Sequence, residues 1–332
     1  IGLFRFDETE FTEETALMVT ESNEIGYFEF DKVPAGNFLV REIAPPKAFV
    51  LTEEIFPVEI TEDGQTIEIT IENQIIKGTA ETIKVDADYP DHKLSGAVFE
   101  VYADVDNNGE FNADIDKLAG EMTETEPGLY QMKDLVYGNY FLHEKEAPEF
   151  FEKDDGYYPF SITENEAIVR IETEAGVGFL NKAQTGSLKV VKTADDDKIE
   201  GRTFKISGTD FMGNDYEQEF KTDENGEIHV TLRVGEYTVS EVAGEDSDKY
   251  ILPDDQTVEI KAGETTTVKM HNKLVPEVPS VPQTGDNPWM PAILSTLAGL
   301  AVLSGGALLF LRYTGKKRKS ADQADEDQGT EE

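Results

Sequence analysis

Three glutamates and three asparagines in this chain occupy equivalent places in a repeated pattern of apolar residues. Each follows apolar residues at a spacing of two: Phe38, Val40 and Glu42; Tyr140, Leu142 and Glu144; Tyr237, Val239 and Glu241; Ile69, Ile71 and Asn73; Val177, Phe179 and Asn181; Val268, Met270 and Asn272. Side chains two positions apart on a β-strand point to the same face. We therefore predict that these polar groups face the apolar core of their modules.

Two lysines follow the same alternation, one on an apolar face and one on a less apolar face: Leu188, Val190 and Lys192; Ala80, Thr82 and Lys84. Burial disfavours the charged forms of lysine and carboxyl groups. A neutral lysine amine is a nucleophile, and a protonated glutamic acid can hydrogen-bond an asparagine carboxamide, polarise its carbonyl and carry protons. The predicted product is a Lys–Asn isopeptide bond, formed with loss of ammonia. The alternative is an unreacted buried Lys–Glu pair beside a hydrogen-bonded asparagine.

The elements that position these groups are predicted to be short β-strands in three repeated units. Each unit has a turn glycine, then an aromatic strand that ends in the glutamate, then an alternating strand that ends in the asparagine. Period-2 runs between Gly, Asp and Asn turns favour all-β modules, and no amphipathic helix is predicted before residue 289. We place the units at residues 1–75, 76–183 and 184–274. The first unit enters at the counterpart of Phe99, so its opening strand and its lysine are expected to precede Ile1.

The C-terminal segment has a different composition. A proline-containing spacer leads to a pentapeptide, and together they occupy residues 275–285: the motif is Val281, Pro282, Gln283, Thr284 and Gly285. A hydrophobic run from Trp289 to Leu311 follows, then a cluster of lysines and arginine, then an acidic tail. The run is long enough for one membrane-spanning helix, and the basic cluster favours a cytoplasmic end. Residues 286–332 are therefore predicted to form a single C-terminal transmembrane helix with a basic stop and an acidic tail.

This order of motif, helix and basic cluster resembles the LPXTG-type cell-wall sorting signal of Gram-positive surface proteins. The resemblance implies that a sortase cysteine attacks the carbonyl of Thr284 and releases Gly285 and the residues after it. The new acyl end then passes to an amine on peptidoglycan or on another subunit. Val281 stands where leucine is commoner, which leaves the class of sortase open.

The three units resemble the SpaA and Cna-B repeats of Gram-positive adhesins and pilins. The stretches that begin at Glu42 and Glu144 are similar to the E-box of that family, whereas the third unit keeps Glu241 without the Ala-Pro that follows. The resemblance implies an immunoglobulin- or transthyretin-like β-sandwich in each unit. It also implies self-made crosslinks between the first and last strands, assisted by the glutamates: Lys84 with Asn181, Lys192 with Asn272, and Asn73 with a lysine before residue 1.

Two other features could bind metal. Residues 104–112 carry oxygen-bearing side chains at alternate positions and Gly109 at the sixth, as at the start of a calcium loop. Ile115 stands at the twelfth position, where a calcium loop has glutamate, so we predict an Asx-rich turn and no metal site. The four histidines, His92, His143, His229 and His271, show no metal-ligand spacing and are expected at the surface.

The composition of the chain limits the classes of function that it can have. A formal net charge of -40 disfavours nucleic-acid binding, and the absence of cysteine excludes disulfides. The chain starts at Ile1 without a signal peptide, so we expect it to be part of a longer secreted protein.

We predict a non-catalytic structural or adhesive protein of the Gram-positive cell wall, without a cofactor, whose precursor crosses the membrane once. Expected partners are sortase, peptidoglycan, and other pilin subunits or a host extracellular-matrix ligand. The alternatives are a pilin polymerised by a pilus sortase, the stalk of a surface enzyme, and a host-ligand-binding module.

Overall fold

The structure is a computed structural model, and it describes residues 1–277. These residues are all-β apart from one short 3-10 helix, which confirms the predicted all-β modules. Among them no helix is long and apolar enough to cross a membrane. The predicted transmembrane helix and the pentapeptide at Val281–Gly285 lie outside the described residues.

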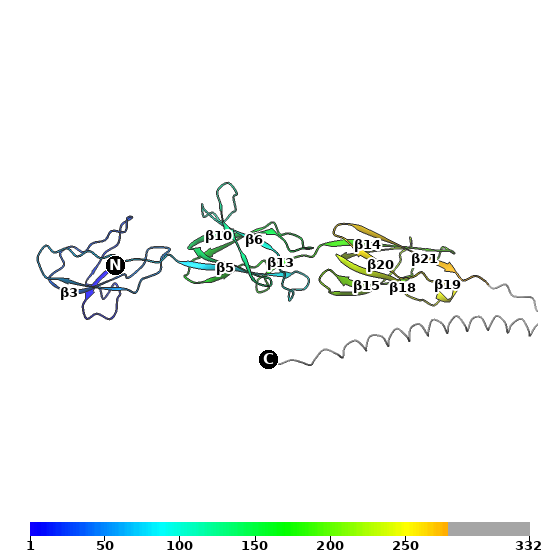
Figure 1. The fold of residues 1–332 in the computed structure, drawn as a ribbon, viewed down its shortest axis with the longest axis horizontal. Helices are drawn as coiled ribbons and strands as arrows, with labels where there is room; N and C mark the ends of the chain where they lie inside the picture. The colour runs from blue at the N-terminus through cyan, green and yellow to red at the C-terminus, as the bar shows by residue number, and fades with distance from the viewer. Residues whose placement is uncertain (278–332) are drawn as a thin grey trace, which may run out of the picture. The chain divides into compact units, whose positions relative to one another are not determined.

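The third unit is a sandwich of two four-stranded sheets (Figure 1). One sheet has the order β17-β14-β21-β19 and the other the order β16-β15-β18-β20. The elements are β14 (Thr185–Ala194), β15 (Thr203–Asp210), β16 (Asp215–Lys221), β17 (Glu227–Arg233), β18 (Gly235–Glu241), η1 (Ser247–Lys249), β19 (Tyr250–Ile251), β20 (Gln256–Ile260) and β21 (Thr265–Leu274). In β14 every second residue from Gly186 to Ala194 is buried, as its period-2 pattern requires.

The second unit has the same architecture. Its sheets have the orders β11-β10-β6-β7 and β12-β5-β9-β8, and β13 also pairs with β5. The elements are β5 (Lys77–Asp86), β6 (Val98–Ala103), β7 (Lys117–Glu121), β8 (Thr123–Glu126), β9 (Leu129–Val136), β10 (Gly138–Glu146), β11 (Tyr157–Ile162), β12 (Ile168–Arg170) and β13 (Phe179–Asn181). Apolar residues of both sheets form one core, including Phe99, Tyr130 and Leu142.

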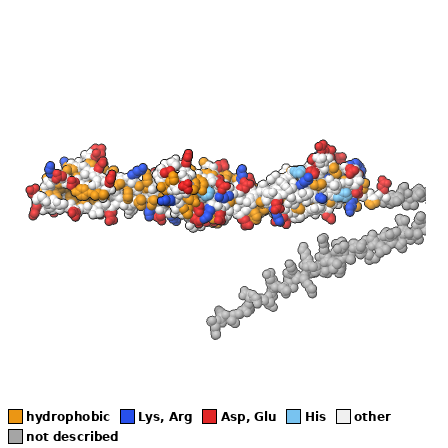
Figure 2. All heavy atoms as spheres, turned by 90° about the horizontal axis from the view of Figure 1, so that it is seen from above, with side chains coloured by type: hydrophobic (Ala, Val, Ile, Leu, Met, Phe, Trp, Pro, Cys, Tyr) orange, Lys and Arg blue, Asp and Glu red, His pale blue; other side chains and the backbone are white. Residues whose placement is uncertain are grey.

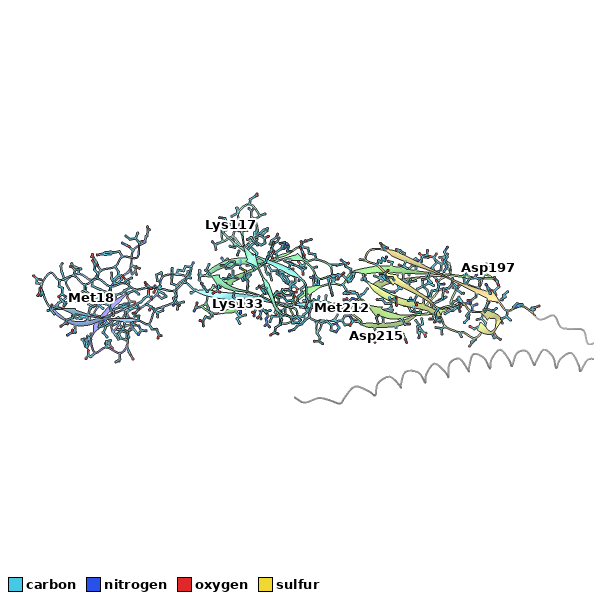
Figure 3. All side chains as sticks on the ribbon, viewed as in Figure 1. Met18, Lys117, Lys133, Asp197, Met212 and Asp215 are labelled. Atoms are coloured by element: carbon cyan, nitrogen blue, oxygen red, sulfur yellow. The ribbon has the colours of Figure 1, made fainter. Side chains whose placement is uncertain are left out.

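The first unit contains the counterpart of only one of these sheets. Its order is β2-β1-β3-β4, with β1 (Gly2–Arg5), β2 (Met18–Val19), β3 (Gly36–Arg41) and β4 (Ile55–Ile60). Met18, labelled in Figure 3, pairs with Leu3 of β1. The stretches 28–33 and 66–72, which correspond to β17 and to the part of β21 before its asparagine, are not strands.

A turn glycine before β17 fixes how this strand meets β14. Gly226 has a φ of 74°, in the left-handed region, and a Cβ there would lie 2.8 Å from the carbonyl oxygen of Lys192. The Lys192 N–H donates to the carbonyl of Gly226 at 2.8 Å. The second unit repeats the arrangement, because the Lys84 N–H donates to the carbonyl of Gly128 at 2.8 Å. The repeated turn glycine therefore sets the position of each lysine.

Candidate lysine–glutamate–asparagine sites

In the third unit the three predicted polar residues meet inside the sandwich. Lys192 is 1% exposed and its Nζ lies 3.1 Å from Oε2 of Glu241, an ion-pair distance without the angles of a hydrogen bond. The Nδ2 of Asn272 donates to Oε1 of Glu241 at 2.8 Å. Glu241 thus lies between the amine and the carboxamide. Figure 1 labels the three strands that carry these residues, β14, β18 and β21.

The second unit brings together the corresponding residues. Lys84 and Glu144 are both fully buried, and Nζ lies 3.2 Å from Oε1. The Nδ2 of Asn181 is 2.9 Å from each oxygen of Glu144. Lys84 also donates to the carbonyl of Phe179 at 3.3 Å. The weaker apolar face predicted around Lys84 is nevertheless a buried face, because Ala80 is small and Thr82 donates its hydroxyl to the carbonyl of Ile171 at 2.7 Å.

Strand register explains why lysine and asparagine meet. The lysine strand runs parallel to the asparagine strand, and Lys192 lies opposite Met270, two residues before Asn272. In the second unit Lys84 lies opposite Phe179, again two residues before the asparagine. Residues two apart share a face, so both side chains point into the core next to each other. Glutamate reaches the same place from the opposite sheet.

Burial favours the neutral amine at both sites. In the second unit burial lowers the pKa of Lys84 to about 8, although the negative charges of Glu144 and Asp154 act against this shift. Burial also lowers the pKa of Lys192, against the attraction of the nearby Glu241 carboxylate. Two charges removed from water interact strongly but lose much hydration, so proton transfer from lysine to glutamate is an accessible alternative to the ion pair.

The glutamate contacts the carboxamide nitrogen and not its oxygen. We predicted that a protonated glutamic acid would polarise the asparagine carbonyl, but in both sites Nδ2 faces the carboxylate and Oδ1 has no hydrogen-bond partner. A carboxylate accepts hydrogen bonds only, so it attracts the amide N–H group. The glutamate is therefore placed to pass a proton from the amine to the nitrogen that would leave.

The first unit holds two of the three groups. Glu42 is 5% exposed and accepts a hydrogen bond from Nδ2 of Asn73 at 2.7 Å. The Oδ1 of Asn73 is buried and has no partner. Within residues 1–277 no salt bridge to Glu42 is formed, so the lysine of the other two sites has no counterpart here.

Sequence reasoning missed the backbone donors that orient two of the glutamates. The N–H of Asp154 donates to Oε2 of Glu144 at 2.8 Å, and the N–H of Thr52 donates to Oε2 of Glu42 at 3.2 Å. Both donors lie ten residues after their glutamate, a repeated spacing that could have indicated them.

A second missed cluster lies at the border of the second and third units. The guanidinium of Arg233 forms salt bridges with Asp86 and with Asp210, the latter at 2.9 Å, and its side chain is 12% exposed. The ring of Phe211 lies 5.4 Å below the guanidinium carbon. Met212 and Asp215, labelled in Figure 3, mark the turn that follows. No local sequence pattern predicts that Asp86 contacts Arg233, because the two residues are distant in the sequence. Only the tertiary structure reveals this salt bridge.

The acidic loop of residues 104–116 folds as an Asx-rich turn. Oxygens of Asp104, Asp106 and Asp116 lie within 4.8 Å of one another. However, Asp104 accepts the N–H groups of Asn108 and Gly109, and Asp116 accepts those of Val105 and Asn112. The loop ends at Lys117, labelled in Figure 3. Backbone donors thus satisfy the buried carboxylates of this loop.

One histidine differs from the prediction. His143 was expected at the surface, but it is 8% exposed and stacks on Tyr157 with ring centroids 4.2 Å apart. Its Nδ1 lies 3.0 Å from the carbonyl oxygen of Gly156. The alternation of side chains along β10 places His143 on the face that points away from the core. Aromatic rings cover this outer face and bury His143 there.

Comparison with known proteins shows a repeated family match. Residues 3–75, 78–176 and 186–274 each match the family described as SpaA, prealbumin-like fold domain. No curated protein matches the chain.

Several solved structures are similar to this chain. The Bacillus anthracis TIE protein is 25% identical with a TM-score of 0.57, and the match covers 76% of this chain and 45% of that one. The chain thus spans less than half of the length of that protein. A streptococcal ancillary pilin is 18% identical, with a TM-score of 0.27 and 74% and 77% of the two chains covered. The shaft pilin SpaA from Lactobacillus rhamnosus GG is 14% identical, with a TM-score of 0.26 and coverage of 61% and 99%.

Proposed function

The chain belongs to the family of SpaA prealbumin-like fold domains, and from this we propose that it is a structural protein of the Gram-positive cell surface whose modules are sealed by Lys–Asn isopeptide bonds. The proposed bonds join Lys84 to Asn181 and Lys192 to Asn272. Glu144 and Glu241 assist the reaction.

One observation carries this proposal. In each of two modules a buried glutamate contacts both a buried lysine and a buried asparagine, at distances between 2.8 and 3.2 Å. Apolar residues in place of the buried lysine and glutamate would make a module at least as stable, because the desolvation of two charges offsets much of their attraction. Stability of the core alone therefore does not explain these residues. A core without cysteine gains a covalent tie from these residues instead.

The proposed reaction uses these residues alone. Glutamate takes a proton from the lysine ammonium and leaves a neutral amine. The amine Nζ attacks the asparagine Cγ, the Cγ–Nδ2 bond breaks, and the new Nζ–Cγ amide bond forms. Glutamate returns its proton to Nδ2, which becomes ammonia as it leaves. The second proton lost by Nζ is taken up by this ammonia, so that the carboxylate is regenerated and the nitrogen departs as ammonium.

Intact-mass spectrometry of the chain tests the proposal. We expect a mass lower than that of the sequence by two ammonia molecules, and peptide mapping should join Lys84 to Asn181 and Lys192 to Asn272. Lys192→Met should reduce the loss to one ammonia. The control is Lys189→Arg in the same strand, since Lys189 points to the other face and pairs with Glu227 at 2.7 Å, and it should keep both losses. A folded chain with the full sequence mass would refute the bonds.

We further propose that sortase anchors the protein at Val281–Gly285, with transfer of the Thr284 acyl group to an amine of peptidoglycan. The order of motif, hydrophobic run and basic cluster in the sequence supports this proposal. Before processing, the hydrophobic run would hold the precursor in the membrane.

A further inference from the structure

A buried acidic residue stands beside the bond site of the second module. Asp86 is fully buried at the end of β5, on the same side of the strand as Lys84, and it lies opposite Asn181 of β13. The corresponding residue of the third module is Ala194, which lies opposite Asn272. The same sandwich thus closes with an alanine in the third module. Neither the fold nor the proposed bond therefore requires a buried charge at this place.

The partner of Asp86 belongs to the next module. Arg233, the last residue of β17, donates to Oδ2 of Asp86, and within residues 1–277 no other cation lies within salt-bridge distance of that carboxylate. The other oxygen, Oδ1, accepts the N–H of Asp88 at 2.9 Å. A buried carboxylate is costly without a partner cation. Arg233 of the third module therefore stabilises the end of β5 in its buried position.

Arg233 is held at the border of the two modules by its own surroundings. It pairs with Asp210 at 2.9 Å, and its guanidinium lies over the rings of Phe151 and Phe211. These rings, one from each module, pack edge to face with centroids 5.3 Å apart. Arg233 therefore reaches Asp86 through a contact that exists only when the third module is folded against the second.

The strand that carries Asn181 depends on this border more than its counterpart in the third module does. β13 has three residues, whereas β21 has ten, so β13 forms few ladder hydrogen bonds of its own. The carbonyl of Asn181 accepts the N–H of Ala87, the residue after Asp86, at 2.9 Å. Further along, the carbonyl of Gln184 accepts the N–H of Val234 in the third module at 3.1 Å. The position of Asn181 therefore depends on the end of β5 and on the linker that follows.

We propose that Arg233 is a positioning residue for the bond of the second module. By neutralising Asp86 it keeps the end of β5 buried and paired with β13, which holds Asn181 beside Lys84. The inference rests on the isopeptide bonds proposed above. Arg233 acts through Asp86, and the proton transfers remain with Glu144. The consequence is an order of events, because the second module closes its bond efficiently only after the third module has folded against it.

Refolding of the whole chain from urea tests the inference, because both bonds can be followed in one sample. Portions are quenched in acid at intervals and digested, and the crosslinked peptides of the second and third modules are quantified by mass spectrometry. Arg233→Met should slow the second-module bond by roughly tenfold or more, because it leaves Asp86 buried and unpaired. The third-module bond should keep its rate.

A compensating change in the second module separates positioning from general damage. Asp86→Ala copies the residue that the third module has at this place, so Arg233→Met combined with Asp86→Ala should recover the second-module rate. Loss of structure in the third module would not be repaired by this change. The matched control is Arg202→Met, since the Arg202 side chain is also 12% exposed but pairs with Asp246 of its own module at 2.7 Å. It should leave the second-module rate unchanged.

The outcomes distinguish this inference from the one on which it rests. A second-module bond that forms at the normal rate with Arg233→Met overturns the positioning role, as does equal slowing of both bonds. A double variant that stays slow, or equal slowing of the second-module bond by Arg202→Met, also overturns it. If the unaltered chain loses no ammonia in either module, the isopeptide chemistry is refuted and this inference falls with it. Selective slowing by Arg233→Met with recovery in the double variant supports it.

Discussion

The lysine of the second module is enclosed by aromatic rings as well as by its glutamate. Lys84 Nζ lies 4.4 Å from the ring centroid of Phe179, which itself packs edge-on against Phe99 at 5.0 Å. The face of an aromatic ring stabilises a cation less than hydration by bulk water does. Burial among these rings therefore lowers the pKa of Lys84, despite the cation–π contact. Packing thus favours the neutral, nucleophilic form of Lys84. The N–H of Asp154 orients its partner Glu144 by a hydrogen bond.

The rate of bond formation in the second module should depend on pH. With a pKa of about 8 for Lys84, the neutral amine should increase roughly tenfold per pH unit below that value and level off above it. The Lys192→Met chain isolates this module and can be refolded from urea at several pH values, with ammonia loss followed by mass. A rate that keeps rising towards the ordinary lysine pKa of 10.5 would contradict the burial effect.

The sign of the stability effect follows from the same shift. Lys84 titrates near 8 in the unreacted folded module and at 10.5 when unfolded. Between these values the unfolded chain binds more protons, so this residue makes the unfolding free energy rise with pH across that window. The bonded module has no such titration, because the amide nitrogen does not ionise.

The strands β14 and β21 are the elements that the third-module bond would join. They lie side by side in one sheet, although they open and close the module in sequence. A bond between Lys192 and Asn272 closes a loop of 80 residues (272 minus 192). Such a closure restricts the unfolded chain more than a tie between strands that are consecutive in the sequence would.

Loss of this bond should lower the stability of the third module. By the loop-closure relation used for disulfides, the difference is roughly 4 to 5 kcal/mol. Glu241→Gln should leave the bond unformed, because an amide cannot carry the proton, and should lower the urea midpoint measured by circular dichroism. The double variant Lys192→Met with Glu241→Gln removes the buried charge as well. If both variants unfold at the wild-type midpoint, the bond contributes nothing to stability.

The whole chain combines strong negative charge with separate cores. On the face shown in Figure 2, acidic side chains are spread over the described residues and do not gather in one patch. This distribution suits solvated modules and disfavours binding to nucleic acid. Each module has its own apolar core, and Arg233 links the second and third through Asp86 and Asp210. These features fit a structural role for the array.

Anchoring should depend on Thr284. Thr284→Ala removes the residue whose carbonyl the proposed sortase reaction attacks, so the protein should shift from the peptidoglycan fraction to the membrane and soluble fractions. Ser280→Ala, just before the motif, is the matched control and should remain in the wall fraction. Equal wall attachment of Thr284→Ala and the unaltered protein would refute sortase anchoring at this site.

Local sequence pattern was sufficient to predict the all-β modules and the burial of Glu42, Glu144, Asn181 and Asn272. Alternation between two faces is a property of a few neighbouring residues, so Glu144 and Lys192 could be assigned to the core without knowing their partners.

Only the tertiary structure decided the contacts between distant residues. The approach of Asn181 Nδ2 to Glu144, the pairing of Asp86 with Arg233, and the third acidic group Asp116 depend on strand pairing over long sequence separations. The burial of His143 depends on Tyr157, which arrives from the neighbouring strand. Such contacts join residues that are far apart in the sequence and form only when the chain folds. The periodicity of neighbouring residues carries no information about them.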